Sequence, residues 1–329
     1  MIDTHDSLLR EYFGRVERAW AGRAWRLRRS GVMLVGAGAI GSNLAHWLAR
    51  AGVGEFVIID GDYVEPHNLE RTACYTERDV GKPKVEVLAR CIRGIRRRLK
   101  PRVLAIHSYL DSEFFSKYYP RVRSRIRRVN LMIVGVDNDW ARVSASMLAN
   151  EFNIPMMVIS FGPNIGRVLY FPRPRDGPCF LCTLTRDDWE RMGEVLGYNM
   201  QATCPRCGRR FKIINWRWPQ ATSIEGLNDY QGIRPVIENG KVIALHIKCP
   251  YCGNEFQVTT PDAPAPALSE WVYLTTAYAY YWAVMHLLGK PPKWNATYIL
   301  MDDNSIKILT YQLATSDKHA EDHVNPKIK

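Results

Sequence analysis

A glycine-rich turn between an apolar run and a helical segment constrains the fold of this chain more than any other feature. The apolar run is 31–35, and a segment with helical periodicity follows at 39–51. Between them lie Gly36, Gly38 and Gly41, spaced as Gly-x-Gly-x-x-Gly. Short apolar runs are typical of buried parallel strands, and glycines in such a turn let backbone N–H groups approach phosphate. The turn therefore predicts the first β-α unit of a nucleotide-binding sheet.

The alternation of strand and helix continues along the first half of the chain. Strands are expected at 55–60, 103–107, 131–136 and 156–160, and helices at 84–99 and 140–152. Such alternation implies right-handed crossovers and a parallel sheet with helices on both faces.

The pattern breaks after Phe171, where a segment rich in Gly and Pro extends to a linker at 261–267. The uncharged stretch 271–288 is long enough to cross a bilayer, but its Thr, Tyr and His residues favour a buried helix. Strands at 297–302 and 305–312 are expected to form a hairpin. The expected division is a helical arm at 1–29, a nucleotide domain at 30–182, an insertion at 183–267, and the remainder of the nucleotide domain with a tail at 268–329.

Positive charge dominates the composition. The chain has 45 Lys and Arg against 33 Asp and Glu, a net charge of +12, with arginine clusters at 93–102 and 121–128. An anionic partner or substrate fits this charge, but such runs are at least as often solvated surfaces. Without interleaved aromatic residues, nucleic-acid binding is not favoured. Acidic residues precede any apolar run, so we expect no secretory signal, no membrane association and a cytoplasmic location.

Six of the eight cysteines occur in Cys-x-x-Cys pairs, a spacing that indicates metal binding in an intracellular protein. The pairs are Cys179/Cys182, Cys204/Cys207 and Cys249/Cys252. The second and third are near copies, each followed by glycine and then an aromatic residue. Together they predict one structural Zn²⁺ site with four cysteine ligands in an inserted zinc ribbon. The two remaining cysteines, Cys74 and Cys91, are expected to be buried thiols.

Polar residues follow the glycine turn in a definite order. They are Asp60 and Asp62 after the second strand, Asn68 and Arg71, Lys84 at a helix start, and Asp137 and Asn138 after the fourth strand. A carboxylate at the position of Asp60 can accept hydrogen bonds from ribose hydroxyls. A dehydrogenase would not need the cations and the magnesium-binding carboxylate. ATP with Mg²⁺ is therefore the expected ligand.

These blocks resemble the ThiF/MoeB family of E1-like adenylating enzymes, which activate ubiquitin-like and sulfur-carrier proteins. The family pattern runs GxGxxG, then D-x-D-x-V-x-x-x-N-L-x-R, then G-x-x-K-V/A-E, then D-N. It covers 31–182 well and 268–312 loosely. The resemblance implies an α/β fold with a Rossmann-like, doubly wound and mostly parallel sheet, an inserted zinc ribbon, and a C-terminal helix plus β-hairpin.

The resemblance also implies roles for the residues that match the pattern. Gly36, Gly38 and Gly41 would line ATP, Asp60 would hold the ribose, Asn68, Arg71 and Lys84 would contact the phosphates, and Asp137 would bind Mg²⁺, with Asp62 and Asn138 in the same set. The implied reaction is ATP-dependent adenylation of the C-terminal glycine carboxylate of a small ubiquitin-fold protein, which releases pyrophosphate and leaves an acyl-adenylate.

In this family an arginine from the partner subunit lies over the triphosphate, which implies a homodimer. Arg15 is the nearest match, with Arg10 as the alternative, and a helix-surface arginine remains the competing interpretation. The pair Cys179/Cys182 matches the first half of a family zinc site whose second half is absent here. His319 and His323 lie at nearly the same distance past the last strands, so they predict a second, mixed site, with a metal-free tail as the alternative.

Two other functions remain open at this stage. One is a related tRNA threonylcarbamoyladenosine dehydratase, to which the arginine clusters would be suited. The other is a zinc-ribbon binding module on an inactive nucleotide domain, which the intact Arg71, Lys84 and Asp137 argue against. Some relatives form an enzyme thioester, for which Cys74 is the nearest thiol, but we expect adenylation without an obligatory thioester.

Overall fold

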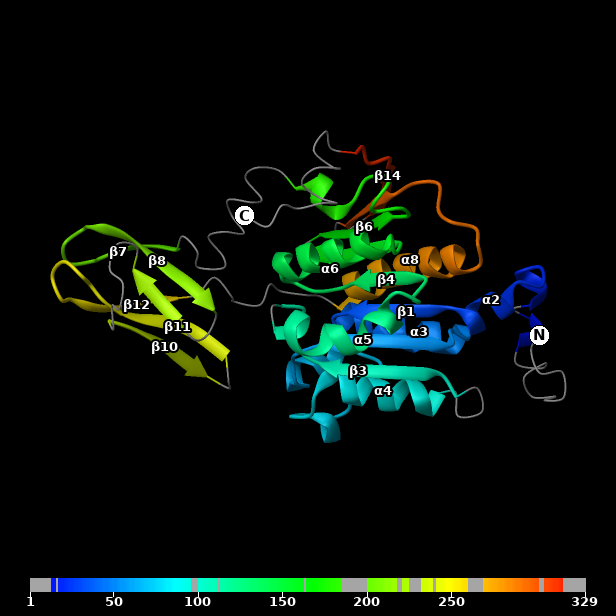
Figure 1. Ribbon diagram of the computed structural model, residues 1–329, viewed down its shortest axis with the longest axis horizontal. Coiled ribbons are helices and arrows are strands. Elements are labelled where there is room, and N and C mark those ends of the chain that lie inside the picture. The colour runs from blue at the N-terminus through cyan, green and yellow to red at the C-terminus, as the bar shows by residue number, and fades with distance from the viewer. Residues whose placement is uncertain are drawn as a thin grey trace. The chain divides into compact units, whose positions relative to one another are not determined.

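The predicted apolar runs form the parallel part of an eight-stranded sheet in the computed structural model (Figure 1). The parallel strands are β1 (Gly31–Val35), β2 (Glu55–Asp60), β3 (Arg102–His107), β4 (Leu131–Val134) and β5 (Met156–Gly162). They lie in the order β3-β2-β1-β4-β5, so the order reverses between β1 and β4. Every residue of β1 and β4 is buried, as expected for strands that are covered on both faces.

Three antiparallel strands extend the sheet beyond β5. They are β6 (Ile165–Phe171), β13 (Ala296–Met301) and β14 (Ile306–Tyr311). The predicted hairpin of β13 and β14 is confirmed. The sequence analysis missed β6, because Gly166 and Arg167 interrupt its apolar run and the strand follows β5 without a crossover helix.

Helices cover both faces of this sheet. On one face lie α3 (Ala39–Ala51), α4 (Lys84–Ile95) and α8 (Ser269–Leu287), which share one buried core with alternate strand residues. On the other face, α6 (Asp139–Phe152) contacts β4 and β5. The interpretation of α8 as a core helix is confirmed, since Val272, Ala279 and Trp282 are buried. No helix among the described residues is long and apolar enough to cross a bilayer.

Shorter helical segments connect these elements. They are α2 (Ala24–Arg29), η1 (Pro66–Arg71), η2 (Glu77–Asp79), the π-helical turn η3 (Phe114–Tyr118), α5 (Tyr119–Ile126) and η4 (Phe180–Thr183). The predicted end of the second helix, at 96–99, lies outside the described residues. The structure describes residues 13–15, 17–95, 100–111, 113–162, 164–184, 200–217, 221–224, 232–238, 241–259, 269–301 and 305–315.

The chain divides into two compact units. One comprises Met1–Thr183 and Ala267–Lys329, and the other comprises Leu184–Pro266. The second unit contains two three-stranded antiparallel sheets. Their strands are β7 (Met200–Thr203), β8 (Arg210–Arg217) and β9 (Ala221–Ile224) in one sheet, and β10 (Ile233–Glu238), β11 (Lys241–Lys248) and β12 (Glu255–Thr259) in the other. A small core that includes Phe211, Leu245 and Ile247 holds this unit together.

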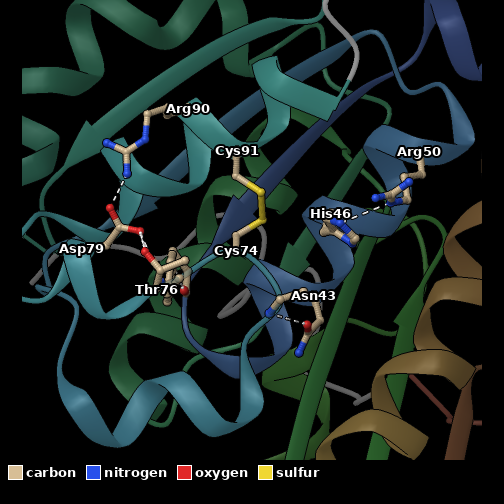
Figure 2. Close-up of a disulfide and its surroundings, with 11 residues drawn as sticks. Asn43, His46, Arg50, Cys74, Thr76, Asp79, Arg90 and Cys91 are labelled. Atoms are coloured by element: carbon tan, nitrogen blue, oxygen red, sulfur yellow. Dashed lines mark hydrogen bonds and ion pairs between the residues drawn. A yellow bond between two sulfur atoms is a disulfide. The ribbon is translucent and has the colours of Figure 1, made fainter.

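Cys74 and Cys91 form a disulfide, so the prediction of two buried thiols was wrong (Figure 2). Cys74 lies in the loop after η1, and Cys91 lies on α4 with its Cα atom 5.8 Å from that of Cys74. The chain turns back through η2, and this return brings the two residues together. Their separation of 17 residues in the sequence does not predict this contact. The disulfide links the segment that carries Arg71 to the helix that begins at Lys84.

We predict that the variant with Cys74→Ala and Cys91→Ala loses about 3 kcal/mol of unfolding free energy, because the disulfide restricts a loop of this length in the unfolded chain. Denaturant titration of wild type and variant, each with and without reductant, measures this loss. Reductant should destabilise the wild type and leave the variant unchanged. Equal stability of the oxidised wild type and the variant would contradict the prediction.

Candidate nucleotide site and cysteine cluster

The three glycines of the turn lie in different surroundings, and two of them have no room for a side chain. Gly36 has a φ of 98°, and a Cβ atom there would lie 2.6 Å from the Gly135 carbonyl oxygen. A Cβ atom on Gly41 would lie 1.9 Å from the Gly36 carbonyl oxygen. A Cβ atom on Gly38 would meet nothing within 4 Å. Gly36 and Gly41 therefore allow close packing of the turn, whereas Gly38 faces open space at the start of α3.

Asp60 and Tyr75 hold the turn in place. The Asp60 carboxylate accepts hydrogen bonds from the N–H groups of Ala37 (2.6 Å) and Asp62 (2.7 Å). The Tyr75 hydroxyl donates to the Ala37 carbonyl oxygen at 2.5 Å. Burial and the nearby Asp60 and Asp62 raise the pKa of Tyr75 well above its ordinary value, so this phenol remains a donor. The sequence analysis missed Tyr75, which no motif contains.

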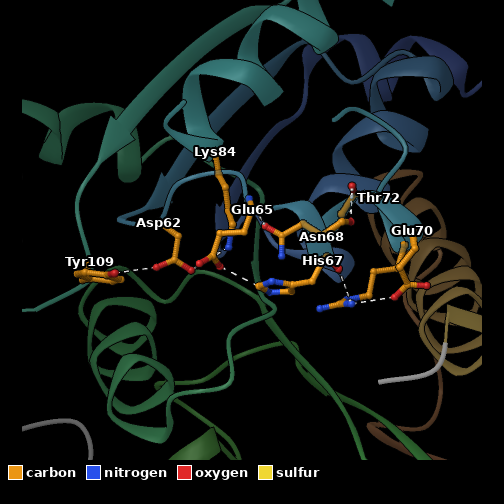
Figure 3. Close-up of polar contacts among 9 residues, drawn as sticks. Asp62, Glu65, His67, Asn68, Glu70, Thr72, Lys84 and Tyr109 are labelled. Carbon is orange, nitrogen blue, oxygen red and sulfur yellow. Dashed lines mark hydrogen bonds and ion pairs between the residues drawn. The ribbon is translucent and has the colours of Figure 1, made fainter. Parts of the chain in front are cut away.

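Lys84, Asp62 and Tyr109 form a second group beside the turn (Figure 3). The Lys84 ammonium lies 2.8 Å from one oxygen of Asp62, and the Tyr109 hydroxyl donates to the other oxygen at 2.7 Å. Burial alone would lower the pKa of Lys84, but Asp60 and Asp62 outweigh that effect and raise it. Lys84 is therefore a buried cation, with 8% of its side chain exposed, held at a defined position.

Asp137 follows a different parallel strand from Asp60 and Asp62, at the same edge of the sheet. It lies past the carboxyl end of β4, and it is exposed. Burial, the hydrogen bond to Asp62 and the charges of Asp62, Asp60 and Asp137 all raise the pKa of Tyr109. Of these three carboxylates, Asp62 contacts the Tyr109 hydroxyl directly, and Asp60 and Asp137 act on it through their charge. Nucleotides bind at this edge of doubly wound sheets, where the strand order reverses.

Tyr109 is a candidate site residue that the sequence analysis missed. Its ring packs over Gly61, where a Cβ atom would lie 2.8 Å from the ring. The residue as a whole is 59% exposed. Its position two residues past β3, at the same sheet edge as Asp60, is the signal that could have identified it.

Asn68, Arg71 and Asn138 have structural contacts as well as their predicted roles. The Asn68 side-chain oxygen accepts the Glu65 N–H at 3.0 Å and so caps η1. Arg71 contacts Glu70 and the His67 carbonyl oxygen, both at 2.8 Å. The Asn138 side chain caps α6 by accepting the N–H of Trp140. The caps orient Asn68 and Asn138, and the contact of all three residues with a nucleotide stays a prediction.

Of the arginines and histidines that were predicted to act in the partner's site or as zinc ligands, the structure describes Arg15 alone. Arg15 is exposed in a helical segment of the N-terminal arm, whereas Arg10 lies outside the described residues. His319 and His323 also lie outside them. Cys179 and Cys182 have their Sγ atoms 3.7 Å apart. Burial raises the pKa of Cys179 to about 11.

The four ribbon cysteines converge on one point. The sulfur atoms of Cys204, Cys207, Cys249 and Cys252 all lie within 4.8 Å of one another. Two of the distances, Cys204 to Cys252 and Cys207 to Cys249, are 3.7 Å. In a tetrahedral site with Zn–S bonds of ~2.3 Å, neighbouring sulfurs lie ~3.8 Å apart. The cluster therefore fits a tetrahedral zinc ion.

The protein environment also favours a thiolate in this cluster. Burial would raise the pKa of Cys204, but the N–H groups of Cys207 and Arg206 hydrogen-bond to its sulfur and lower that pKa to about 6. At Cys252 the hydrogen bond from the Asn254 N–H lowers the pKa, but burial and hydrogen bonds with the other three thiols outweigh it and raise the pKa to about 11. Metal ligation requires the thiolate form, so the protein alone favours the charged ligand at Cys204 and not at every ligand of the site.

Comparison with known proteins identifies the family. The sequence pattern of the ThiF family matches residues 17–317, which is most of the chain. The chain belongs to the ThiF family. The resemblance inferred from the four sequence blocks is thereby confirmed, and so is the expected α/β fold.

Relatives of this ThiF-family chain are named as activating enzymes and adenylyltransferases. A stretch of 70 residues is 46% identical to the SAMP-activating enzyme E1 of Haloferax volcanii, covering 21% of this chain and 26% of that protein. Over 163 residues the chain is 31% identical to the sulfur carrier protein ThiS adenylyltransferase of Bacillus subtilis, covering 48% and 45%. The matched regions span less than half of each relative.

The solved structure of E. coli MccB with ATP has the same fold. It superposes with a TM-score of 0.59 at 14% identity, and the match covers 93% of this chain and 72% of MccB. At this identity the similarity shows the fold alone.

Two glycine variants test the geometry of the turn. Gly41→Ala should cost about 2 kcal/mol or more of stability, because its Cβ atom would collide with backbone. Gly38→Ala should leave the melting temperature unchanged and weaken ATP binding, since its Cβ atom would occupy the open space in front of α3. Thermal unfolding and calorimetric ATP titration measure the two effects. Unchanged ATP affinity in Gly38→Ala would contradict this assignment.

Metal analysis tests the cysteine sites. We expect about two zinc ions per chain, one in the ribbon and one held by Cys179, Cys182, His319 and His323, because each structural site needs four ligands. Changing Cys204 and Cys249 to Ser should remove the first ion only. Deleting 317–329 should remove the second only, and an unchanged zinc content in the deletion would refute the mixed site.

Proposed function

We propose that this protein binds ATP with Mg²⁺ and adenylates the C-terminal glycine carboxylate of a small ubiquitin-fold or sulfur-carrier protein. The observation that carries the proposal is the contact network that joins Asp60, Asp62 and Lys84 to the glycine turn, with Asp137 past the carboxyl end of the parallel strand β4. The relatives are named for activation of SAMP and adenylation of the sulfur carrier ThiS, which supports this class of acceptor.

The local charges suit a nucleotide triphosphate with its metal ion. Asp62 and Asp137 offer carboxylate oxygens of the kind that Mg²⁺ prefers, and Mg²⁺ would neutralise phosphate charge. Lys84 supplies a fixed cation beside them, and Arg71 supplies another on η1. In the proposed division of roles, Asp60 accepts the ribose hydroxyls while it continues to hold the turn.

The chemistry requires positioning more than acid–base catalysis. An oxygen of the acceptor carboxylate attacks the α-phosphorus of ATP, and the bond from that phosphorus to the bridging oxygen breaks. The electron pair leaves with pyrophosphate, and an acyl-adenylate remains. A carboxylate is a weak nucleophile that the phosphates repel, so fixed cations and in-line placement provide most of the rate enhancement.

The proposal includes a two-fold dimer that completes the site. Arg15 is exposed on the N-terminal arm, where it is available to a partner subunit. In the proposed dimer it reaches the triphosphate of the partner and stabilises charge as it develops.

An enzyme thioester is not part of this proposal. Of the eight cysteines, two form the disulfide, four form the ribbon cluster, and Cys179 and Cys182 lie together as a pair. Cys74, the thiol nearest the site in sequence, is oxidised. Adenylation with direct transfer from the acyl-adenylate therefore fits the cysteine arrangement best.

ATP–pyrophosphate exchange tests the reaction. The probes are ubiquitin-fold proteins that end in Gly-Gly and the same proteins without the last glycine. Asp137→Ala should reduce exchange by about 100-fold or more, because the exposed carboxylate supports the metal and not the fold. The matched control is Asp139→Ala, which removes a carboxylate two residues away that pairs with Arg142.

The control variant should retain most of the exchange activity, and both variants should unfold near the wild-type temperature. Exchange that is equal in Asp137→Ala and wild type would refute the metal-binding role. Exchange that does not depend on the terminal glycine would refute the proposed acceptor.

A further inference from the structure

Basic side chains gather at the sheet edge opposite the candidate nucleotide site. Parallel strands begin at one edge and end at the other, so residues that precede β1, β3 and β4 lie at the same edge. Arg28 and Arg29 precede β1, Arg102 begins β3, and Arg128 precedes β4. β2 has six residues, so this edge lies about 20 Å from the carboxyl ends of the strands.

Contacts, mostly of the backbone, show that the segments that carry Arg28, Arg102 and Arg128 are neighbours and not merely on the same edge. A Cβ atom on Gly54 would lie 1.9 Å from the Arg28 carbonyl oxygen and 3.5 Å from its guanidinium. The Gly54 carbonyl oxygen accepts the Arg102 N–H at 2.9 Å. A Cβ atom on Gly31 would lie 3.8 Å from the Arg128 carbonyl oxygen. Gly31 and Gly54 thus let the three arginine-bearing segments pack together.

The electrostatics of this edge favour an anion. Burial and the charge of Arg102 both lower the pKa of Arg28. Glu55 pairs with Arg102 at 2.7 Å and offsets part of this positive charge. The segment 184–266 has ten Lys and Arg against nine Asp and Glu, so eleven of the twelve excess positive charges lie on the unit that carries this edge.

An exposed aromatic side chain lies next to Arg29. Trp25 on α2 is 40% exposed, and the guanidinium of Arg29 lies 4.9 Å from the centre of its ring. Arginine and tryptophan together form a stacking surface for an unpaired base, which a lone phosphate or a lipid headgroup would not use. We define the basic edge patch as Trp25, Arg28, Arg29, Arg102 and Arg128.

We propose that the basic edge patch binds single-stranded nucleic acid, with the arginines on the phosphates and a base stacked on Trp25. A duplex fits less well, because its bases are already stacked and cannot cover the tryptophan ring. The site is separate from the candidate nucleotide site, and its function does not depend on the proposed adenylation.

Fluorescence anisotropy with a labelled 20-nucleotide oligouridylate tests the proposal. Four phosphate contacts predict a salt slope of about −3, so affinity should fall roughly 50-fold between 50 and 200 mM salt. Arg29→Ala and Arg128→Ala should each reduce the slope by about 0.7. Trp25→Ala should weaken binding by about five-fold or more, and Trp25→Phe should restore most of it.

Arg123→Ala is the matched control, because Arg123 is an exposed arginine outside the patch that, like Arg102, pairs with a carboxylate, here Glu151 at 2.9 Å. It should bind oligouridylate as the wild type does. A parallel titration with oligodeoxythymidylate shows whether the patch prefers RNA or DNA. Binding of either oligonucleotide supports the proposal.

Three results would overturn the proposal. One is equal weakening by Arg123→Ala and Arg29→Ala, which would indicate nonspecific attraction to the net charge. Another is an unchanged affinity in Trp25→Ala. The third is binding to phosphatidylserine vesicles without binding to either oligonucleotide, which would identify the patch as a membrane contact.

Discussion

A single carboxylate, Asp60, joins the parts of the candidate nucleotide site. Its oxygens accept the N–H groups of Ala37, in the glycine turn, and of Asp62, in the loop after β2. Tyr75 binds the Ala37 carbonyl oxygen, and Lys84 pairs with Asp62. The open face at Gly38 and the cation at Lys84 therefore keep their relative positions through this carboxylate. In the proposed function, the same geometry determines where the phosphates lie.

Much of the fold could be predicted because local sequence and burial agree. Apolar runs such as β1 and β4 are covered on both faces, so their composition alone identifies them as strands. The exceptions depend on contacts between residues that are far apart in the sequence. β6 is a strand because it pairs with β5 and β13 while α8 packs on Gly166, and none of this is visible in its own residues. The Cys74–Cys91 disulfide likewise depends on the return of the chain through η2.

The candidate site was predictable only where a motif carries the residue. The glycines, Asp60, Asp62, Lys84 and Asp137 belong to ordered blocks, and contacts join Asp60, Asp62 and Lys84 to the glycine turn. Tyr75 and Tyr109 complete the site through hydrogen bonds that no spacing rule predicts. The basic edge patch could not be predicted from a motif either. Arg102 and Arg128 come from separate clusters, whereas Trp25, Arg28 and Arg29 lie on α2, which belongs to neither cluster.

The central claim is that the carboxyl edge of the sheet is a site for ATP with Mg²⁺. Calorimetric titration of the full chain with ATP, in the presence and absence of Mg²⁺, and with NAD tests it most directly. The account predicts that ATP binds with Mg²⁺, that removal of Mg²⁺ weakens this binding, and that NAD does not compete. NAD binding that is tighter than ATP binding, or ATP affinity that is independent of Mg²⁺ and of Asp137, would contradict the account.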